Sequence, residues 1–285
     1  MNLPKKVIIT EVSPRDGLQN EKVFIPTKIK IKFIELLTQA GFPIIEATAF
    51  VNPKKIPALS DHEIIMKHFR SNNKTKYAAL IPNVQGLENA LLCGCKYISV
   101  FTTVSETFSQ KNTNCSIEES LQRISEIIKI AKQKNIFIRG YISCVMGCPY
   151  EKFIAIEKTV TLAKKLFDMG CDEIALGDTI GTGTPPLAQE LIHAVNKFIP
   201  IEKVAIHFHD TYGRAIENIS ACLQLGISKI DSSVGSLGGC PYAKGATGNV
   251  ATESVLDLLK ELKIETGVDL TAAKKARDFI RSHLG

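Results

Sequence analysis

The chain has 285 residues, of which 45% are hydrophobic and 22% charged, as is usual for a globular protein with a large core. No apolar run reaches the roughly 18 residues of a membrane-spanning helix, and residues 1–10 lack the features of a signal peptide. We therefore expect a cytoplasmic protein without a membrane partner. The lysines are not clustered with aromatic residues, which argues against nucleic-acid binding. The net charge of +6 is compatible with an anionic small substrate.

The sequence contains eight cysteines. Disulfides are rare in a reducing compartment, so these residues are expected to be buried thiols or catalytic groups. Cys93 and Cys95 form one close pair and Cys144 and Cys148 another, but neither pair has the Cys-x-x-Cys spacing that is typical of zinc sites. We interpret both pairs as structural thiols.

Apolar runs rich in β-formers alternate with segments of helical periodicity along the whole chain. The predicted strands are residues 7–12, 44–47, 77–81, 97–101, 137–142, 173–176, 204–207 and 229–234. The clearest predicted helices are residues 27–40, 117–133, 154–169, 187–198 and 215–225. No linker or change of composition interrupts this alternation, which predicts a single (β/α)8 TIM-barrel domain over residues 1–285.

Unusual polar residues follow the predicted strands at their C-terminal ends, where the active sites of such barrels lie. They are Arg15 and Asp16 after the first strand, Glu46 at the end of the second, Asp178 after the sixth, and His207 and His209 at the end of the seventh. A glycine-rich segment, residues 232–253, follows the eighth strand. A barrel would therefore bring these distant residues together on one face.

His207 and His209 are two residues apart, so both imidazoles can point to the same side of a strand. Asp16 and Asn249 could supply a carboxylate and an amide oxygen from the same rim. Two imidazoles and two oxygen ligands suit an exchangeable Mg²⁺ or Mn²⁺ ion better than a closed tetrahedral zinc site. The alternative is that the two histidines are merely hydrogen-bonded at a strand end. The presence of Asp16 and Asn249 on the same rim disfavours this alternative.

Arg15 stays charged at any relevant pH and could stabilise an oxyanion beside such a metal. It could also form a salt bridge with Glu46 or Asp178, and those carboxylates could simply be paired at strand ends. Cys240 lies in a Gly-Gly-Cys-Pro turn. Its thiol could donate or accept a proton, because the reference pKa of cysteine is about 8.5, or it could be no more than a small turn residue.

Four segments closely resemble the 3-hydroxy-3-methylglutaryl-coenzyme A lyase family, which belongs to the metallolyase barrels together with isopropylmalate, homocitrate and citramalate synthases. They are SPRDGLQNE (13–21), GDTIGTGTP (177–185), HFHDTYGRA (207–215) and GGCPYAKGATGNVATE (238–253). The resemblance extends from Glu11 to the C-terminal helix. Its most specific part is the last segment, because the synthases share the Arg-Asp and His-x-His elements but lack the thiol in this setting.

The resemblance implies metal-dependent cleavage of (S)-3-hydroxy-3-methylglutaryl-CoA to acetyl-CoA and acetoacetate, a reaction of leucine degradation and ketone-body metabolism. It also implies a homodimer. The implied metal ligands are Asp16, His207, His209 and Asn249, with Mg²⁺ or Mn²⁺ as the cofactor.

Further roles follow from the same resemblance. Arg15 would polarise the thioester oxygen, Cys240 would act as an acid or base, and His207 or Asp178 would remove a proton. Glu46, Asp178 and Glu253 would support the site. Arg15, Gln19 and Asn114 would contact the substrate. The segment NCSIEES (114–120) resembles the family as well.

Other functions remain compatible with these residues. A lyase for a longer 3-hydroxyacyl-CoA is one, and an acetyl-CoA-dependent synthase of the isopropylmalate or citramalate type is another. Cys240 and the lack of a regulatory domain argue against the synthase. A non-catalytic barrel that binds a ligand is a hypothesis of a different class, and the intact set of metal ligands argues against it.

Overall fold

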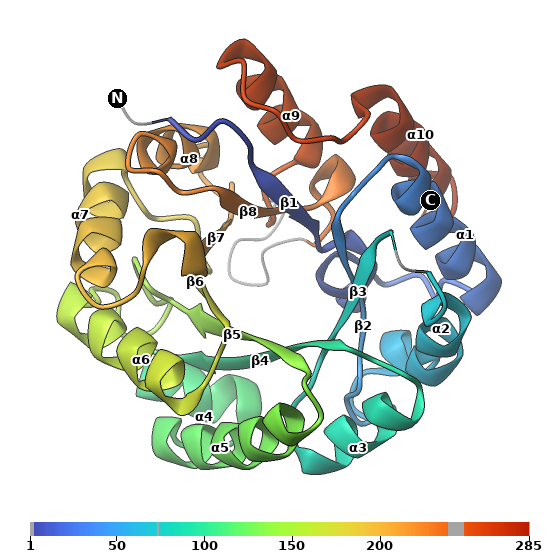
Figure 1. Ribbon diagram of the computed structural model, residues 1–285, viewed down its shortest axis with the longest axis horizontal. Coiled ribbons are helices and arrows are strands. Elements are labelled where there is room, and N and C mark those ends of the chain that lie inside the picture. Colours follow the sequence, from blue (N-terminus) through green and yellow to red (C-terminus); the bar gives the residue numbers. More distant parts are fainter. Residues whose placement is uncertain (1–2, 73, 239–247, 285) are drawn as a thin grey trace.

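Eight parallel strands close into a barrel in the computed structural model, with helices around the outside (Figure 1). The structure describes residues 3–72, 74–238 and 248–284. The strands are β1 (Ile8–Glu11), β2 (Ile44–Ala49), β3 (Lys76–Leu80), β4 (Tyr97–Thr103), β5 (Phe137–Ser143), β6 (Glu173–Asp178), β7 (Val204–Phe208) and β8 (Lys229–Ser232). Each strand pairs with its neighbour in chain order, and β8 pairs with β1. The predicted TIM barrel is confirmed.

The outer ring is made of helices that connect successive strands or follow the last one (Figure 1). They are α1 (Thr27–Gln39), α2 (His62–Phe69), α3 (Val84–Leu92), α4 (Glu106–Thr113), α5 (Ile117–Gln133), α6 (Ile156–Met169), α7 (Pro185–Asn196), α8 (Ala215–Leu223), α9 (Thr252–Glu261) and α10 (Leu270–Arg281). Short helical turns are η1 (Ser13–Gly17), η2 (Pro57–Leu59), η3 (Ile201–Lys203) and η4 (Val234–Ser236). Within the described residues, no helix has the length and apolar character needed to cross a membrane.

Local sequence signals explain where several helices begin and end. Ser116 accepts a hydrogen bond from the Glu119 amide at 3.1 Å, and the Glu119 carboxylate accepts one from the Ser116 amide at 2.7 Å. This capping box starts α5. Helix α6 ends at Gly170, whose φ of 114° lies in the left-handed region that favours glycine. Helix α4 ends at Asn114, which also has a positive φ, a conformation that asparagine tolerates better than most residues.

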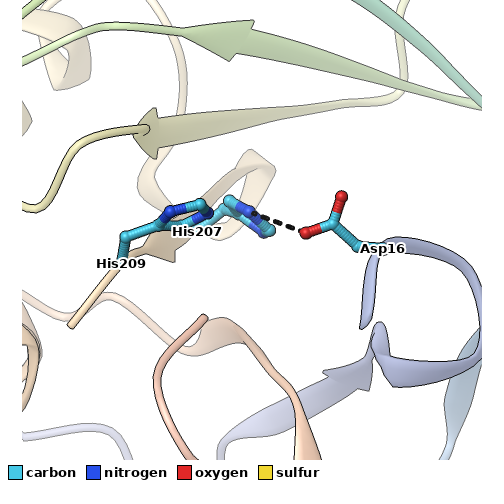
Figure 2. A group of neighbouring side chains, drawn as sticks. All are labelled: Asp16, His207 and His209. Atoms are coloured by element: carbon cyan, nitrogen blue, oxygen red, sulfur yellow. Dashed lines mark ion pairs between the residues drawn. The ribbon is translucent and has the colours of Figure 1, made fainter. Parts of the chain in front are cut away.

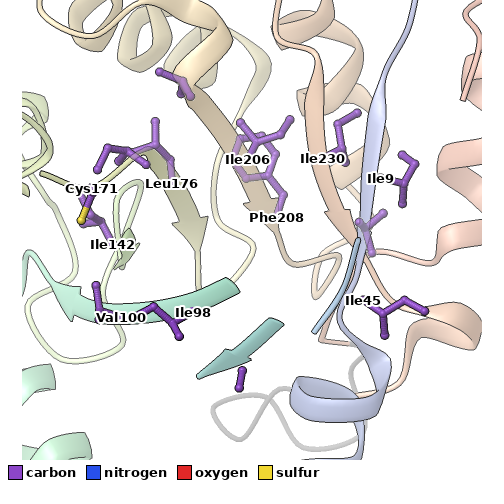
Figure 3. Close-up of a cluster of buried hydrophobic side chains, with 14 of the residues drawn as sticks. Ile9, Ile45, Ile98, Val100, Ile142, Cys171, Leu176, Ile206, Phe208 and Ile230 are labelled. Atoms are coloured by element: carbon purple, nitrogen blue, oxygen red, sulfur yellow. The ribbon is translucent and has the colours of Figure 1, made fainter. Parts of the chain in front are cut away.

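The strands separate two kinds of side chain. Large aliphatic residues such as Ile9, Ile45 and Ile206 are fully buried in the main hydrophobic core (Figure 3). Alternate positions on the strands, including Ala175 and Ala205, belong to a second and smaller cluster. Successive residues of a strand point to opposite faces, so the aliphatic side chains meet the helices and the small or polar ones fill the barrel. The barrel interior therefore has room for polar groups beneath the C-terminal rim.

The strand boundaries differ from the prediction by one or two residues, and two of these differences concern predicted site residues. Strand β2 continues to Ala49, so Glu46 lies within the strand and not at its end. The pairing of β2 with β3 extends through Ala49 and Leu80, with a register shift between Glu46 and Thr48. Asp178 is the last residue of β6, paired with Phe208, and does not follow the strand. Backbone pairing with the next strand, which a single apolar run does not reveal, lengthens both elements.

Candidate active site

Arg15 and Asp16 lie on η1, the short turn that directly follows β1. Gly17 ends this turn, and a Cβ atom there would lie 2.8 Å from the Cβ atom of Leu237. The absence of a side chain at Gly17 therefore lets the turn pack closely against the segment that follows β8.

Glu11, the last residue of β1, anchors this region from below. Its fully buried carboxylate accepts hydrogen bonds from the Ser13 amide at 3.0 Å, the Val234 amide at 3.1 Å and the Thr252 hydroxyl at 2.7 Å. These donors belong to η1, η4 and α9. One carboxyl group thus connects the turn that carries Arg15 to the chain on both sides of residues 239–247.

Burial raises the pKa of Glu11 to about 7, although the hydrogen bonds from Ser13, Thr252 and Val234 oppose the shift. The folded protein therefore holds this proton more tightly than the unfolded chain, and the free energy of unfolding should fall as the pH rises from 4.5 to about 7. Glu11→Gln imitates the protonated carboxyl group. Between pH 6 and pH 8, the free energy of unfolding should fall by about 1.4 kcal/mol more in the parent than in the variant. This difference is the free-energy equivalent of one pKa unit.

Urea unfolding of both proteins in the presence of a chelator measures this difference. Contributions from His209 and Asp178, whose pKa values are shifted to about 4 and about 6, are common to both proteins and cancel. The same pH dependence in the parent and in Glu11→Gln would show that the Glu11 carboxyl group does not titrate in this range.

The central feature of the rim is a cluster of Asp16, His207 and His209 (Figure 2). One possible ligand atom from each residue lies within 4.8 Å of the other two. His207 belongs to β7, and its Nε2 atom is 4.0 Å from Oδ2 of Asp16. His209 lies just beyond β7, where it forms an isolated bridge with Asn249. The Asn249 amide donates to Oδ2 of Asp16 at 2.7 Å, so all four predicted ligand residues meet at one place.

The protonation states of Asp16 and His209 suit a metal. Burial alone would raise the pKa of Asp16, but the charge of Arg15, the neighbouring histidines and the hydrogen bond from Asn249 hold it well below its usual range. Burial is the main reason that the pKa of His209 falls to about 4. Metal ligands must be an ionised carboxylate and neutral imidazoles. In addition, the buried Nδ1 atom of His209 has no hydrogen-bond partner among the described residues. A ring nitrogen of this kind can serve as a ligand, so the set of residues fits a divalent cation.

Arg15 is almost fully buried between two carboxylates. Its Nε atom donates to Oε2 of Glu46 at 2.6 Å, and its Nη1 atom pairs with Asp16. The predicted salt bridge between Arg15 and Glu46 is therefore present. The guanidinium group lies directly beside the cluster, with its orientation set by both carboxylates.

A cavity of about 250 Å³ opens above these residues. Its polar lining includes Arg15, Asp16, Gln19, Asn20, Asn112, Thr113, Thr179, His207 and His209. Its apolar lining includes Val51, Ile56, Leu80, Phe101 and Phe108. A small substrate with several oxygen atoms on one side and apolar groups on the other would match this lining.

The predicted site residues Asn114 and Glu253 lie outside the cavity lining. Asn114 caps α4 and is not among the residues that line the cavity, whereas Asn112 and Thr113 are. Glu253 accepts a hydrogen bond from the Gly235 amide at 3.0 Å, so it braces η4 from α9. Cys240 lies outside the described residues, although Gly238, two residues earlier, lines the cavity.

Asp178 is completely buried at the end of β6. Its oxygens accept hydrogen bonds from the amides of Thr182 at 3.2 Å and Gly183 at 2.9 Å. Burial raises its pKa to about 6, against the effect of these amides. Asp178 itself does not line the cavity, but its two neighbours Gly177 and Thr179 do.

Three residues of the site were missed by the sequence reasoning. Tyr141 lines the cavity, and its hydroxyl donates to Asp231 at 2.8 Å. Arg139 also donates to Asp231, at 2.6 Å. A signal was available, because Arg139 and Tyr141 are alternate residues of a predicted buried strand and Asp231 lies within another. Polar side chains at such positions can only point into the barrel.

The fold and this cluster together define a class of protein, the TIM barrels with a possible divalent-metal site of one carboxylate and two imidazoles at the C-terminal rim. The chain belongs to the HMGL-like family, whose profile matches residues 6–280. The membership that the four motifs suggested is thereby confirmed.

Individual relatives agree with this assignment. The chain is 51% identical over 278 residues to the mitochondrial hydroxymethylglutaryl-CoA lyase of Mus musculus, covering 98% of this chain and 86% of the mouse protein. It is 50% identical over 278 residues to the cytoplasmic 3-hydroxy-3-methylglutaryl-CoA lyase of Danio rerio, covering 98% of this chain and 83% of the fish protein. The crystal structure of hydroxymethylglutaryl-CoA lyase from Pseudomonas aeruginosa matches with a TM-score of 0.97 at 50% identity, covering 100% of this chain and 95% of that one.

Proposed function

We propose that this protein is a carbon–carbon lyase that cleaves (S)-3-hydroxy-3-methylglutaryl-CoA to acetyl-CoA and acetoacetate. The observation that carries the proposal is the cluster of Asp16, His207 and His209 beside a buried arginine. It occurs in a chain that is about half identical, over nearly its whole length, to proteins named as this lyase.

Asp16, His207 and His209 would hold the divalent cation, with Asn249 as the fourth ligand. The mixture of imidazole and oxygen donors favours Mg²⁺ or Mn²⁺. When bound, the cation would polarise the oxygen atoms of the substrate and make its tertiary hydroxyl group easier to deprotonate. The low pKa of Asp16 and the neutral His209 ring mean that this part of the site is prepared for the cation before it arrives.

Arg15 supplies the second electrostatic element. Cleavage of the carbon–carbon bond leaves an electron pair on the acetyl-CoA fragment, as the enolate of a thioester. A fixed cationic donor stabilises such developing charge strongly in a site that excludes water. Glu46 and Asp16 hold the Arg15 guanidinium in place from two sides, so little reorganisation is needed when the charge develops.

Two residues, His207 and Asp178, are candidates for the base that removes the hydroxyl proton, and the surroundings of His207 support one of them. The Nδ1 atom of His207 faces Asp231 at 3.2 Å and its Nε2 atom faces Asp16. With Nε2 as a metal ligand, the ring would have no nitrogen free to accept a proton. We therefore assign the base to Asp178, which is ionised at neutral pH with a pKa of about 6. This role requires the segment that follows β6 to release one Asp178 oxygen when substrate is bound.

The remaining roles come from the family. Cys240 would be the acid or base that completes the reaction at the enolate carbon, Gln19 and Asn114 would contact the substrate, and Glu253 would support the surrounding segments. We also propose a cytoplasmic homodimer. The named relatives include both a mitochondrial and a cytoplasmic form, and light scattering of the purified protein tests the dimer.

A panel of substrates tests the proposed activity. Purified protein with Mg²⁺ is offered 3-hydroxy-3-methylglutaryl-CoA, longer 3-hydroxyacyl-CoA relatives, and acetyl-CoA together with pyruvate or 2-oxoisovalerate. The proposal requires acetoacetate and acetyl-CoA from the first substrate and no free CoA release from the condensation mixtures. Turnover only in a condensation mixture would make the protein a synthase, and no turnover at all would favour a binding protein.

A further inference from the structure

A group of buried polar side chains fills the barrel beneath His207. We call it the interior network, and it consists of Thr10, Arg139, Tyr141, Glu173 and Asp231. Its members come from β1, β5, β6 and β8, and all of them are at least nine-tenths buried. The proposed roles of the metal ligands and Arg15 do not use these residues, so the network needs a separate explanation.

Asp231 is the member that lies within hydrogen-bond distance of the metal cluster. Its Oδ2 atom lies 3.2 Å from Nδ1 of His207 and accepts a hydrogen bond from the Tyr141 hydroxyl at 2.8 Å. Its Oδ1 atom accepts a hydrogen bond from Arg139 at 2.6 Å. Backbone pairing of β7 with β8 sets His207 opposite Asp231. The carboxylate is therefore held by partners on both oxygens and cannot rotate away from the ring.

An ionised carboxylate only accepts hydrogen bonds, and a neutral imidazole has a single N–H group. The contact therefore places the proton of His207 on Nδ1 and leaves the lone pair on Nε2, the nitrogen that faces Asp16 at 4.0 Å. A carboxylate behind a histidine ligand orients the ring and makes it a better ligand.

The charge of Asp231 is balanced within the network. Arg139 pairs with Asp231 and also lies 3.1 Å, at its Nε atom, from Glu173. Glu173 in turn pairs with Lys229. Both carboxylates of the network therefore have a cationic partner within the barrel, and Asp231 pairs with Arg139 independently of His207.

We propose that Asp231 is a positioning residue for the metal site, which holds His207 in the Nδ1–H tautomer with Nε2 directed at the cation. The inference rests on the proposed metal-dependent function and goes beyond it, because it gives the interior network a role in the affinity of the site for metal. It predicts that a variant without the Asp231 charge will bind metal poorly even though all four ligands are intact.

The test is Asp231→Asn, with Mn²⁺ binding measured by electron paramagnetic resonance. The asparagine oxygen should face the Arg139 donor, which leaves its NH₂ group toward His207 and favours the opposite tautomer, with a proton on Nε2. Loss of such a partner typically weakens metal binding about 10–100-fold. Glu173→Gln is the matched control, because it removes a carboxylate from the same network without touching His207, and it should bind Mn²⁺ like the parent.

The outcomes separate the two proposals. Parent protein that binds no Mn²⁺ would contradict the metal-dependent function itself. Parent-like affinity in Asp231→Asn, or an equal loss in Glu173→Gln, would overturn the role of Asp231 while leaving that function in place. The parent alone provides a second test that needs no variant. Long-range ¹H–¹⁵N spectra of the chelator-treated protein should show His207 as the Nδ1–H tautomer, and an Nε2–H signal would refute the inference.

Discussion

Replacing Arg15 with lysine should lower kcat by about 10²–10³-fold, the usual effect of removing a group that stabilises an oxyanion, while KM changes little. Lysine keeps the positive charge but loses the planar fork of donors. In the structure this fork reaches Asp16 and Glu46 at the same time, and an ammonium group cannot reproduce both contacts and face the substrate. An interaction made mainly in the transition state lowers kcat without raising KM much.

Steady-state kinetics with saturating Mg²⁺ measure this effect. Arg70→Lys is a matched control, since Arg70 is exposed and is not among the residues that line the cavity, and it should behave like the parent. If Arg15→Lys chiefly raises KM and leaves kcat nearly unchanged, Arg15 stabilises the bound substrate and not the transition state.

Replacing Cys240 with serine should lower kcat by about 10²–10⁴-fold, the range for groups that transfer protons, while metal affinity and melting temperature stay close to those of the parent. A serine hydroxyl has no pKa near neutral and is a poor substitute for a thiol. The basis of this prediction is the sequence around Cys240, which resembles the lyases and not the synthases, and the position of Gly238 in the cavity lining.

Single-turnover and steady-state rates of Cys240→Ser test this assignment. The control is Cys171→Ala, which removes a thiol that is buried between β5 and α6, away from the cavity lining, and should leave kcat unchanged. Parent-like turnover in Cys240→Ser would remove the feature that separates the lyases from the synthases, and the lyase assignment would then depend on the metal cluster and the family comparison.

The strands of the barrel could be predicted because each one is a short apolar run between helical segments. Their ends could not, as Glu46 and Asp178 show, because pairing with the next strand sets the boundary. Helices α2 and α4 are only eight residues long. Periodicity over two turns is too weak a signal to distinguish such helices from loops.

The metal cluster could be predicted because its residues follow different strands of one barrel, and barrel closure alone brings Asp16 near His207 and His209. Asp231 could not be paired with His207 in the same way. Their contact depends on the register of β7 with β8, which local sequence does not encode. The position of Asn114 also depends on local backbone geometry, because it caps α4 and is not among the residues that line the cavity, whereas Asn112 and Thr113 are.

The most direct measurement is the yield of products from 3-hydroxy-3-methylglutaryl-CoA by chelator-treated protein as Mg²⁺ or Mn²⁺ is added back. We expect almost no cleavage without metal, and acetyl-CoA and acetoacetate in equal amounts as the metal is restored. Asp16→Asn should show little recovery at the same metal concentrations, because it lacks the only carboxylate of the cluster. Full cleavage by the metal-free protein, or undiminished recovery in Asp16→Asn, would contradict a metal-dependent lyase site at this rim.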